Sequence, residues 1–274
     1  MNGIDDRPAG KERVGELMAS QQQFPARMAA AEWRKHWPLV VTSMLGWSLV
    51  GIGSVTTGAF IAPLQQAFGW TRAEATIGPL IYAIMSILGQ PIVGRLIDRY
   101  GPRPIALTGL LVLGIGFSLL GTANGSLGQW IALWFLYNIA TQLMLMPTWS
   151  TAVVSEFDAG RGLALATTLS GTAFATSFAP LAATWLILHY GWRAAYMVLG
   201  LGPTSIVLVL ALLFFHSRAD NKRKIGGAAG PAPVPEGMTA QEGLRSPTFY
   251  KLLLGTLIAY TLMVAVLIHM IPIL

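Results

Sequence analysis

Long apolar stretches separated by short polar segments run along this chain of 274 residues. Each stretch reaches or exceeds the ~20 residues that a helix needs to cross a ~30 Å hydrocarbon core. Buried helices of a large soluble protein would carry polar faces, and such faces are missing here. The pattern predicts an all-α polytopic membrane protein with seven spans, at residues 38–63, 73–94, 104–123, 128–152, 163–188, 194–215 and 249–272.

The composition agrees with a lipid environment. Charged residues make up 11% of the chain and hydrophobic residues 54%, whereas a soluble domain carries about 25% charged residues. The chain has no cysteine, so disulfides and cysteine-based sites are excluded. It also lacks a cluster of His, Asp and Glu and a glycine-rich phosphate loop. We therefore expect no enzyme: no catalytic residue, no metal site and no cofactor.

Arginine and lysine residues mark one side of the membrane. Sixteen of the 18 precede the first span or lie in the loops after spans two, four and six, and the alternate loops hold only Arg72 and Arg193. This asymmetry predicts a cytoplasmic N-terminus in a cytoplasmic (inner) membrane or plasma membrane. The pI of about 9.8 then follows from topology, so we expect the lipid bilayer, and no nucleic acid, as a partner.

The spans and polar segments divide the chain into four parts. We expect a cytoplasmic N-terminal tail at 1–36 and a six-span domain at 37–215. A cytoplasmic linker at 216–248 is rich in Gly, Ala and Pro and too poor in apolar side chains to pack. A seventh helix at 249–274 would begin a second, incomplete domain.

A short internal repeat relates the two halves of the six-span domain. Tyr100-Gly-Pro-Arg103 enters span three, and Tyr190-Gly-Trp-Arg193 enters span six, 90 residues later. Because three spans separate the copies, they face opposite sides of the membrane. This is the arrangement of two three-helix units related by a pseudo-twofold axis in the membrane plane.

The loop between spans two and three carries the pattern G-x-L-x-D-R-x-G-x-R, formed by Gly94, Leu96, Asp98, Arg99, Gly101 and Arg103. With six spans and a long linker, it resembles the major facilitator superfamily. Phe60-Ile-Ala-Pro63 in span one and Arg161-Gly-Leu-Ala164 at span five resemble the monocarboxylate and oxalate/formate branch. The resemblance implies a secondary active transporter that works by alternating access on a small solute, in this branch an organic anion such as a mono- or dicarboxylate.

The resemblance covers about residues 38–274, whereas the family normally has twelve helices. We therefore expect either a fragment or a shortened product whose missing C-terminal helices come from a partner. Two alternatives remain open on sequence alone. One is a truncated, non-transporting bundle that binds a partner chain, and the other is a seven-helix receptor or sensor, whose usual outside N-terminus disagrees with the charge count.

The family resemblance also implies a gate in the loop between spans two and three. Asp98 would form a charge network with the neighbouring arginines and a helix end of the second domain. The glycines would permit close packing and a tight turn. The alternative is that the arginines only set topology. The residues expected in this gate are Gly94, Arg95, Asp98, Arg99, Gly101 and Arg103.

Substrate contacts are expected in the spans that line the family's central cavity, which are one, four and seven. Asn138, Thr141 and Gln142 share one face of span four, and amides at bilayer depth need partners. Helix–helix hydrogen bonding without ligand contact is the alternative. The substrate-binding candidates are Asn138, Gln142, Thr141, Trp47, Ser54, Thr57 and Tyr260.

Two further patterns concern span five and the distribution of charge. Gly171, Ala175 and Ala179 lie four residues apart, which predicts close helix packing before a kink at Pro180. Spans one to six carry no acidic or basic residue at mid-depth. Because such residues mark proton relays, we do not expect proton coupling within this half.

Overall fold

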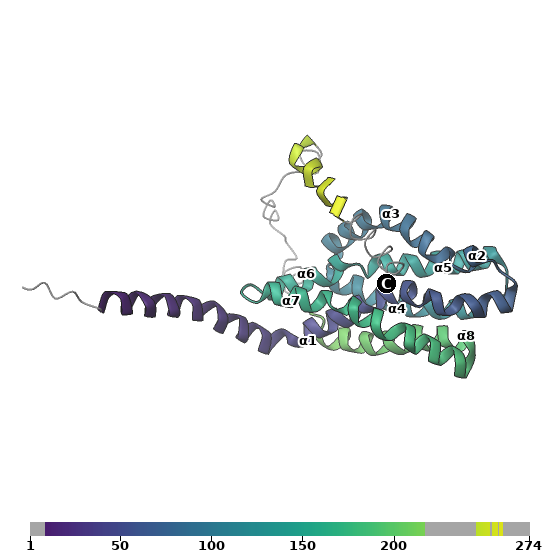
Figure 1. Ribbon diagram of the computed structural model, residues 1–274, viewed down its shortest axis with the longest axis horizontal. Helices are drawn as coiled ribbons and strands as arrows, with labels where there is room; N and C mark the ends of the chain where they lie inside the picture. The colour runs from purple at the N-terminus through teal and green to yellow at the C-terminus, as the bar shows by residue number, and fades with distance from the viewer. Residues whose placement is uncertain (1–8, 217–244, 253, 257, 260–274) are drawn as a thin grey trace, which may run out of the picture. The chain divides into compact units, whose positions relative to one another are not determined.

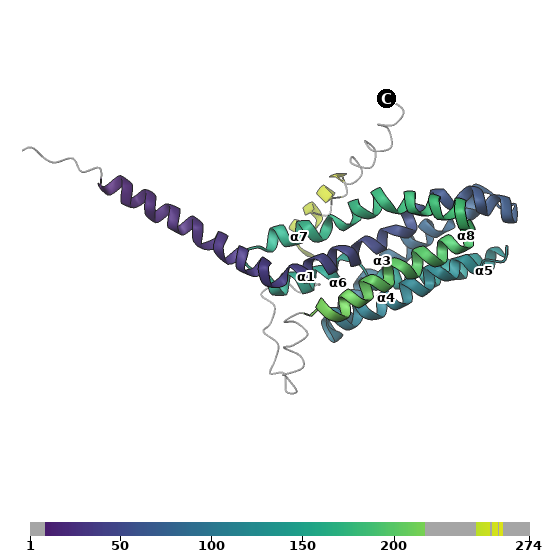
Figure 2. The ribbon, with the colours of Figure 1, turned by 90° about the horizontal axis from the view of Figure 1, so that it is seen from below.

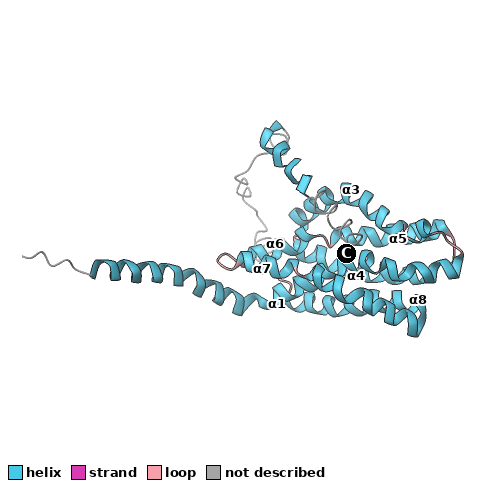
Figure 3. Cartoon of the chain, viewed as in Figure 1, coloured by secondary structure: helices cyan, strands magenta, loops and turns pink. Residues whose placement is uncertain are grey.

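The computed structural model describes residues 9–216 and, except for 253 and 257, residues 245–259. The chain divides into two compact units at residue 225, and each is treated by itself. Every regular element among the described residues is a helix (Figure 3). The predicted all-α fold is confirmed.

The first unit begins with three helices (Figure 1). Helix α1 covers Ala9–Phe68, α2 covers Arg72–Ala75 and α3 covers Ile77–Tyr100. No break in α1 separates the predicted tail from span one. Helix α3 bends by 58° between Ile77–Ile87 and Gly89–Tyr100, and Pro91 lies just beyond the bend. A proline has no backbone N–H to donate to the carbonyl four residues earlier, here that of residue 87, and its ring clashes with the same carbonyl. These two effects account for the bend.

Span three consists of α4 (Pro102–Leu119) and a short 3-10 helix, η1 (Leu120–Thr122). Span four is broken into α5 (Leu127–Leu143) and α6 (Met146–Glu156). The hydroxyl of Thr148 donates to the carbonyl of Leu143 at 2.7 Å, and the Trp149 indole donates to that of Met144 at 2.9 Å. Side-chain donors therefore satisfy the carbonyls that the break leaves free, as a break inside a bilayer requires.

The last helices of this unit are α7 (Arg161–Leu169) and α8 (Gly171–Phe214). Gly191 interrupts α8 with φ 80° and ψ 163°, and Figure 2 shows α8 turning back on itself. In the described part of the chain, four helices are long and apolar enough to cross a membrane, or five if bent α3 counts as one span. The 54-residue segment Arg161–Phe214 corresponds to about 80 Å of helix, so it holds two spans, and the unit has six.

The internal repeat is visible in the backbone. Gly101 has φ 88° and ψ 163°, almost the values of Gly191, and this left-handed region favours glycine. Arg103 donates from Nη2 to the carbonyl of Leu212 at 3.0 Å, and Arg193 donates to that of Ala123 at 3.0 Å. Each arginine therefore starts the third helix of one repeat and binds the C-terminal end of the third helix of the other.

Small residues let the helices of the unit approach closely. A Cβ atom on Gly171 would lie 2.1 Å from the Met44 carbonyl oxygen, and a Cβ on Gly51 would lie 3.8 Å from that of Ala175. Gly171, Ala175 and Ala179 are all buried. The sequence predicts a close helix approach by the small-residue face of span five, and the structure places span one against this face.

The second unit is described only in part. Residues 247–252, 254–256, 258 and 259 are helical, which agrees with the start of a seventh helix. Most of the predicted linker at 216–248 and the substrate candidate Tyr260 lie outside the described residues.

Candidate functional site

Span four carries a buried polar group that we call the span-four cluster: Tyr137, Asn138, Thr141 and Gln142. Asn138 is 1% exposed, and its Nδ2 donates to the carbonyl of Gly78 on α3 at 3.4 Å. Thr141 donates from Oγ1 to the carbonyl of Asn138 at 2.8 Å. These two predicted candidates therefore lie together, and Asn138 also joins span four to span two.

Gln142 differs from Asn138 although both lie on one face of α5. Its side chain is 5% exposed, and neither Nε2 nor Oε1 has a hydrogen-bond partner among the described residues. It lies against α3, where a Cβ on Gly89 would be 2.8 Å from Gln142 Cγ. A buried amide without partners is costly, so Gln142 is the member of the predicted set whose chemistry calls for a ligand or water.

Tyr137 has a similar environment, and the sequence analysis missed it. Its side chain is buried, and its hydroxyl makes no hydrogen bond of good geometry within the described part of the chain. The Tyr137 hydroxyl lies against Gly53, since a Cβ atom on that glycine would be 2.5 Å from it. The Gly53 carbonyl also accepts a hydrogen bond from the Thr57 hydroxyl at 2.6 Å. The sequence signal that could have identified Tyr137 is its position, one residue before Asn138 in a span that lines the family's cavity.

Of the predicted candidates of span one, buried Thr57 lies beside the span-four cluster, because its hydroxyl donates to the carbonyl of Gly53, against which the Tyr137 hydroxyl lies. Ser54 is exposed. Trp47 is half-buried, and its indole nitrogen has no partner among the described residues. Of these three residues, Trp47 alone offers an unused buried donor.

In the predicted gate, the side chains of Arg95, Asp98 and Arg99 are exposed. Within the described residues, no ion pair within 4.0 Å involves Asp98. The expected network between Asp98 and the arginines of its own loop is therefore not formed in this structure. The space beside Gly94 is also open, because no described atom lies within 4 Å of a Cβ at this position. The expected close packing at Gly94 is therefore not seen among the described residues. Gly101 makes the predicted tight turn.

A second, apolar site lies between α1 and the two arms of α8. This crevice has a volume of about 240 Å³. Its lining includes Leu45, Ile52, Phe174 and Phe178, and Ser48 is its one hydroxyl-bearing residue. Because the Ser48 hydroxyl already donates to the Leu45 carbonyl at 2.6 Å, the crevice offers no polar donor for an anion.

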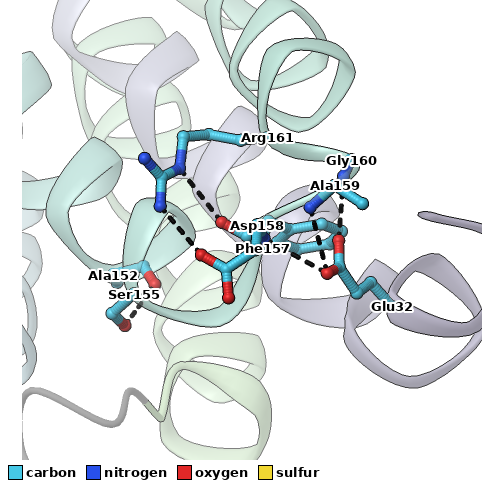
Figure 4. Close-up of polar contacts among 8 residues, drawn as sticks. All are labelled: Glu32, Ala152, Ser155, Phe157, Asp158, Ala159, Gly160 and Arg161. Atoms are coloured by element: carbon cyan, nitrogen blue, oxygen red, sulfur yellow. Dashed lines mark hydrogen bonds and ion pairs between the residues drawn. The ribbon is translucent and has the colours of Figure 1, made fainter. Parts of the chain in front are cut away.

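The sequence analysis also missed a polar contact at the turn between α6 and α7. Glu32 of α1 accepts hydrogen bonds there from the backbone N–H groups of Asp158, Ala159 and Gly160 (Figure 4). These bonds, that from Gly160 above all, hold the pKa of Glu32 below its ordinary value of 4.5. Glu32 is therefore ionised at neutral pH, and its contribution to stability is lost only as the pH falls through this lowered pKa.

The chain is similar to several proteins that are named as transporters. The chain is 27% identical to "Monocarboxylate transporter 13" of Bos taurus over 68% of this chain and 43% of the relative. It is 28% identical to "Monocarboxylate transporter 2" of Mus musculus, over 60% of this chain and 34% of the relative. It is also 28% identical to "4-hydroxybenzoate transporter PcaK" of Acinetobacter baylyi, over 66% and 39%.

The matched segment spans less than half the length of these relatives. The family model described as Major Facilitator Superfamily matches residues 37–274, a range that contains all six spans and the loop motif between spans two and three. The chain therefore belongs to the Major Facilitator Superfamily.

Proposed function

We propose that this chain supplies the first domain of a secondary active transporter that moves a small organic anion, such as a mono- or dicarboxylate, by alternating access. The relatives are named as transporters of monocarboxylates and of 4-hydroxybenzoate. Within the described residues, no group of three or more His, Asp and Glu is placed to hold a metal ion.

The observation that carries this proposal is the set of unused donors in the bundle. The Gln142 amide and the Trp47 indole N–H are buried without hydrogen-bond partners in the described part of the chain, and the buried Tyr137 hydroxyl makes no hydrogen bond of good geometry there. Hydroxyl, amide and indole groups can all donate to a carboxylate. We assign substrate contact to these three residues and keep Asn138, which Thr141 contacts, as a joint between spans four and two.

These donors are all neutral, which limits what this half of a transporter can do alone. Spans one to six carry no lysine or arginine at mid-depth. A charge at the bilayer centre costs about 3 kcal/mol or more without a partner. We therefore propose that a cation from a second six-helix domain, in the same polypeptide or in a partner, completes the site.

The orientation and the gate belong to the same proposal. We place the N-terminus and the turn between α6 and α7 in the cytoplasm, because the loops on that side hold sixteen of the 18 basic residues. Asp98, exposed and without an ion pair within the described residues, is free to bind a helix end of the second domain. That contact would close the cytoplasmic side in one state of the cycle.

Uptake by lipid vesicles tests the proposal. We expect saturable uptake of labelled lactate or 4-hydroxybenzoate by a two-domain transporter that contains this chain, and none by the 274-residue chain alone. Loss of a hydrogen bond to a charged group costs about 1.5–3 kcal/mol, so Tyr137→Phe should weaken half-saturation about 10- to 100-fold.

Tyr196→Phe is the matched control, because Tyr196 is a second buried tyrosine, whose ring stacks on Phe60 at 3.8 Å. Its half-saturation should stay near that of the parent. Saturable uptake by the chain alone would show that the need for a second domain, or the substrate class, is misjudged. Equal uptake by the Tyr137→Phe variant and the parent would remove Tyr137 from the site.

A further inference from the structure

The turn between α6 and α7 lacks a cap of its own. The backbone N–H groups of Asp158, Ala159 and Gly160 precede Arg161, the first residue of α7, and belong to no helix, so they need an acceptor elsewhere. Gly160, the N-cap residue of α7, has no side chain to supply one. The nearby carboxylate of Asp158 is engaged by Arg161, at 3.0 Å. An acceptor for these N–H groups must come from outside the turn.

Glu32 is that acceptor, although it lies 126 to 128 residues earlier in the sequence. Its Oε1 accepts from the N–H groups of Asp158 at 3.2 Å and Ala159 at 3.1 Å, and its Oε2 accepts from Gly160 at 2.8 Å (Figure 4). A carboxylate at a helix N-terminus is also favoured by the helix dipole. One side chain of α1 thus satisfies three backbone donors of the turn.

Two neighbours of Glu32 on α1 extend the contact. The Trp33 ring packs edge-on against Phe157, with centroids 5.6 Å apart. The His36 Nε2 lies 3.6 Å from Oε2 of Glu156, the last residue of α6. Residues 32, 33 and 36 lie on one side of a helix, so this side of α1 contacts the turn through a carboxylate, an aromatic ring and an imidazole.

The matching turn of the other repeat is capped locally. There, Glu74 accepts from the Thr71 backbone at 2.7 Å, and the Thr71 hydroxyl accepts from the Glu74 backbone at 3.3 Å. Thr71 and Glu74 are the N-cap and N3 residues of α2, and the same positions of α7 are Gly160 and Leu163. Neither of these residues can form a capping box. The Glu32 carboxylate therefore takes, at the Gly160 N–H, the place that the Glu74 carboxylate has at the Thr71 N–H.

We infer that Glu32 is a positioning residue that fastens the helix of span one to the turn between spans four and five, so that these three spans move together at their cytoplasmic ends. The consequence for transport rests on the proposed function, but the fastening itself does not. In a rocking cycle, a joint of this kind would pass a displacement at one span end to the other two. Loss of Glu32 would therefore lower turnover and leave substrate affinity unchanged.

Electron spin resonance on the purified chain tests the joint without transport. The chain has no native cysteine, so spin labels can be placed by Met28→Cys on α1 and Leu163→Cys on α7, two exposed positions. We expect one narrow distance distribution in the parent and in the Glu74→Ala control, whose lost cap is local. Glu32→Ala should broaden the distribution at least twofold in width.

A second variant and the conservative replacement separate the joint from misfolding. Glu32→Gln keeps one accepting oxygen without the charge, and its width should fall between those of the parent and Glu32→Ala, whereas Glu32→Asp should restore part of the order. If Glu32→Ala does not fold, the Gln and Asp variants decide. A distribution as narrow in Glu32→Ala or Glu32→Gln as in the parent would overturn the inference.

The transport arm uses vesicles that contain both domains. Glu32→Ala should lower maximal uptake at least threefold at an unchanged half-saturation concentration. Maximal uptake equal to that of the parent, despite a broadened distance distribution, would overturn the role in transport. Absence of saturable uptake in the parent itself would refute the proposed function, and the distance measurement would still decide whether Glu32 fastens the turn.

Discussion

The contact between spans one and five at Gly171 gives the sharpest test of how the bundle is held together. A Cβ atom at this position would lie 2.1 Å from the carbonyl oxygen and 3.0 Å from the carbonyl carbon of Met44. Both atoms belong to the backbone, so no rotamer change can relieve the clash. Gly171→Ala must therefore move the two helices apart by roughly 1 Å, which is the distance to ordinary contact.

The expected cost follows from two opposing terms. Overpacking of a tight contact costs about 1–3 kcal/mol, and a helical alanine returns up to about 1 kcal/mol relative to glycine. Because the clash is with backbone on both sides, the upper part of the range applies, and we expect a net loss of about 2 kcal/mol. For a domain of this size, this corresponds to a melting temperature lower by about 4–8 °C.

Thermal unfolding in detergent, followed by tryptophan fluorescence at one fixed scan rate, measures the effect. Gly58→Ala is the matched control, because Gly58 also lies in a helix but has nothing within 4 Å of a built Cβ. That variant should melt at or slightly above the temperature of the parent. If Gly171→Ala melts as high as Gly58→Ala, spans one and five do not touch as described, and the account of the small-residue face is wrong.

Three further predictions concern orientation, the gate and the arginine contacts between repeats. Reporter fusions at Gly125 and Gly230 should report outside and inside, and the opposite pair of signals would refute the proposed orientation. Asp98→Asn should lower uptake several-fold at equal membrane abundance, since a coupling of this kind is worth roughly 1–3 kcal/mol; uptake equal to that of the parent would argue against a gate. Arg193→Lys should lower the melting temperature, because a lysine lacks the forked donor that reaches Ala123 at 3.0 Å; an unchanged midpoint would show that the contact does not stabilise the bundle.

The sequence predicts most of the fold because the bilayer imposes strict rules. Length and the absence of charge locate the spans, and the left-handed turn at Gly101 has the same conformation as its copy at Gly191. The break inside span four was not predicted. It depends on whether Thr148 and Trp149 can reach the carbonyls of Leu143 and Met144, which is a matter of three-dimensional geometry.

The candidate site was predicted only in part, for a related reason. Asn138 and Gln142 are amides four residues apart on one helix, and sequence alone treats them alike. The structure separates them, because Asn138 reaches the carbonyl of Gly78, whereas Gln142 finds no partner among the described residues. Which of two similar amides is satisfied depends on the neighbouring helix, and the pattern along span four carries no information about that neighbour.

The joint at Glu32 shows how a missing local signal can point to a distant contact. The capping pair Thr71 and Glu74 is visible in the sequence, and the matching positions of α7, Gly160 and Leu163, carry no such pair. Without a capping pair, the backbone N–H groups of the second turn need another acceptor. Any carboxylate within hydrogen-bonding distance could supply it. Glu32 serves because α1 brings it beside the turn. A comparison of the matching turns of two inverted repeats therefore shows which turn needs a contact from another part of the chain.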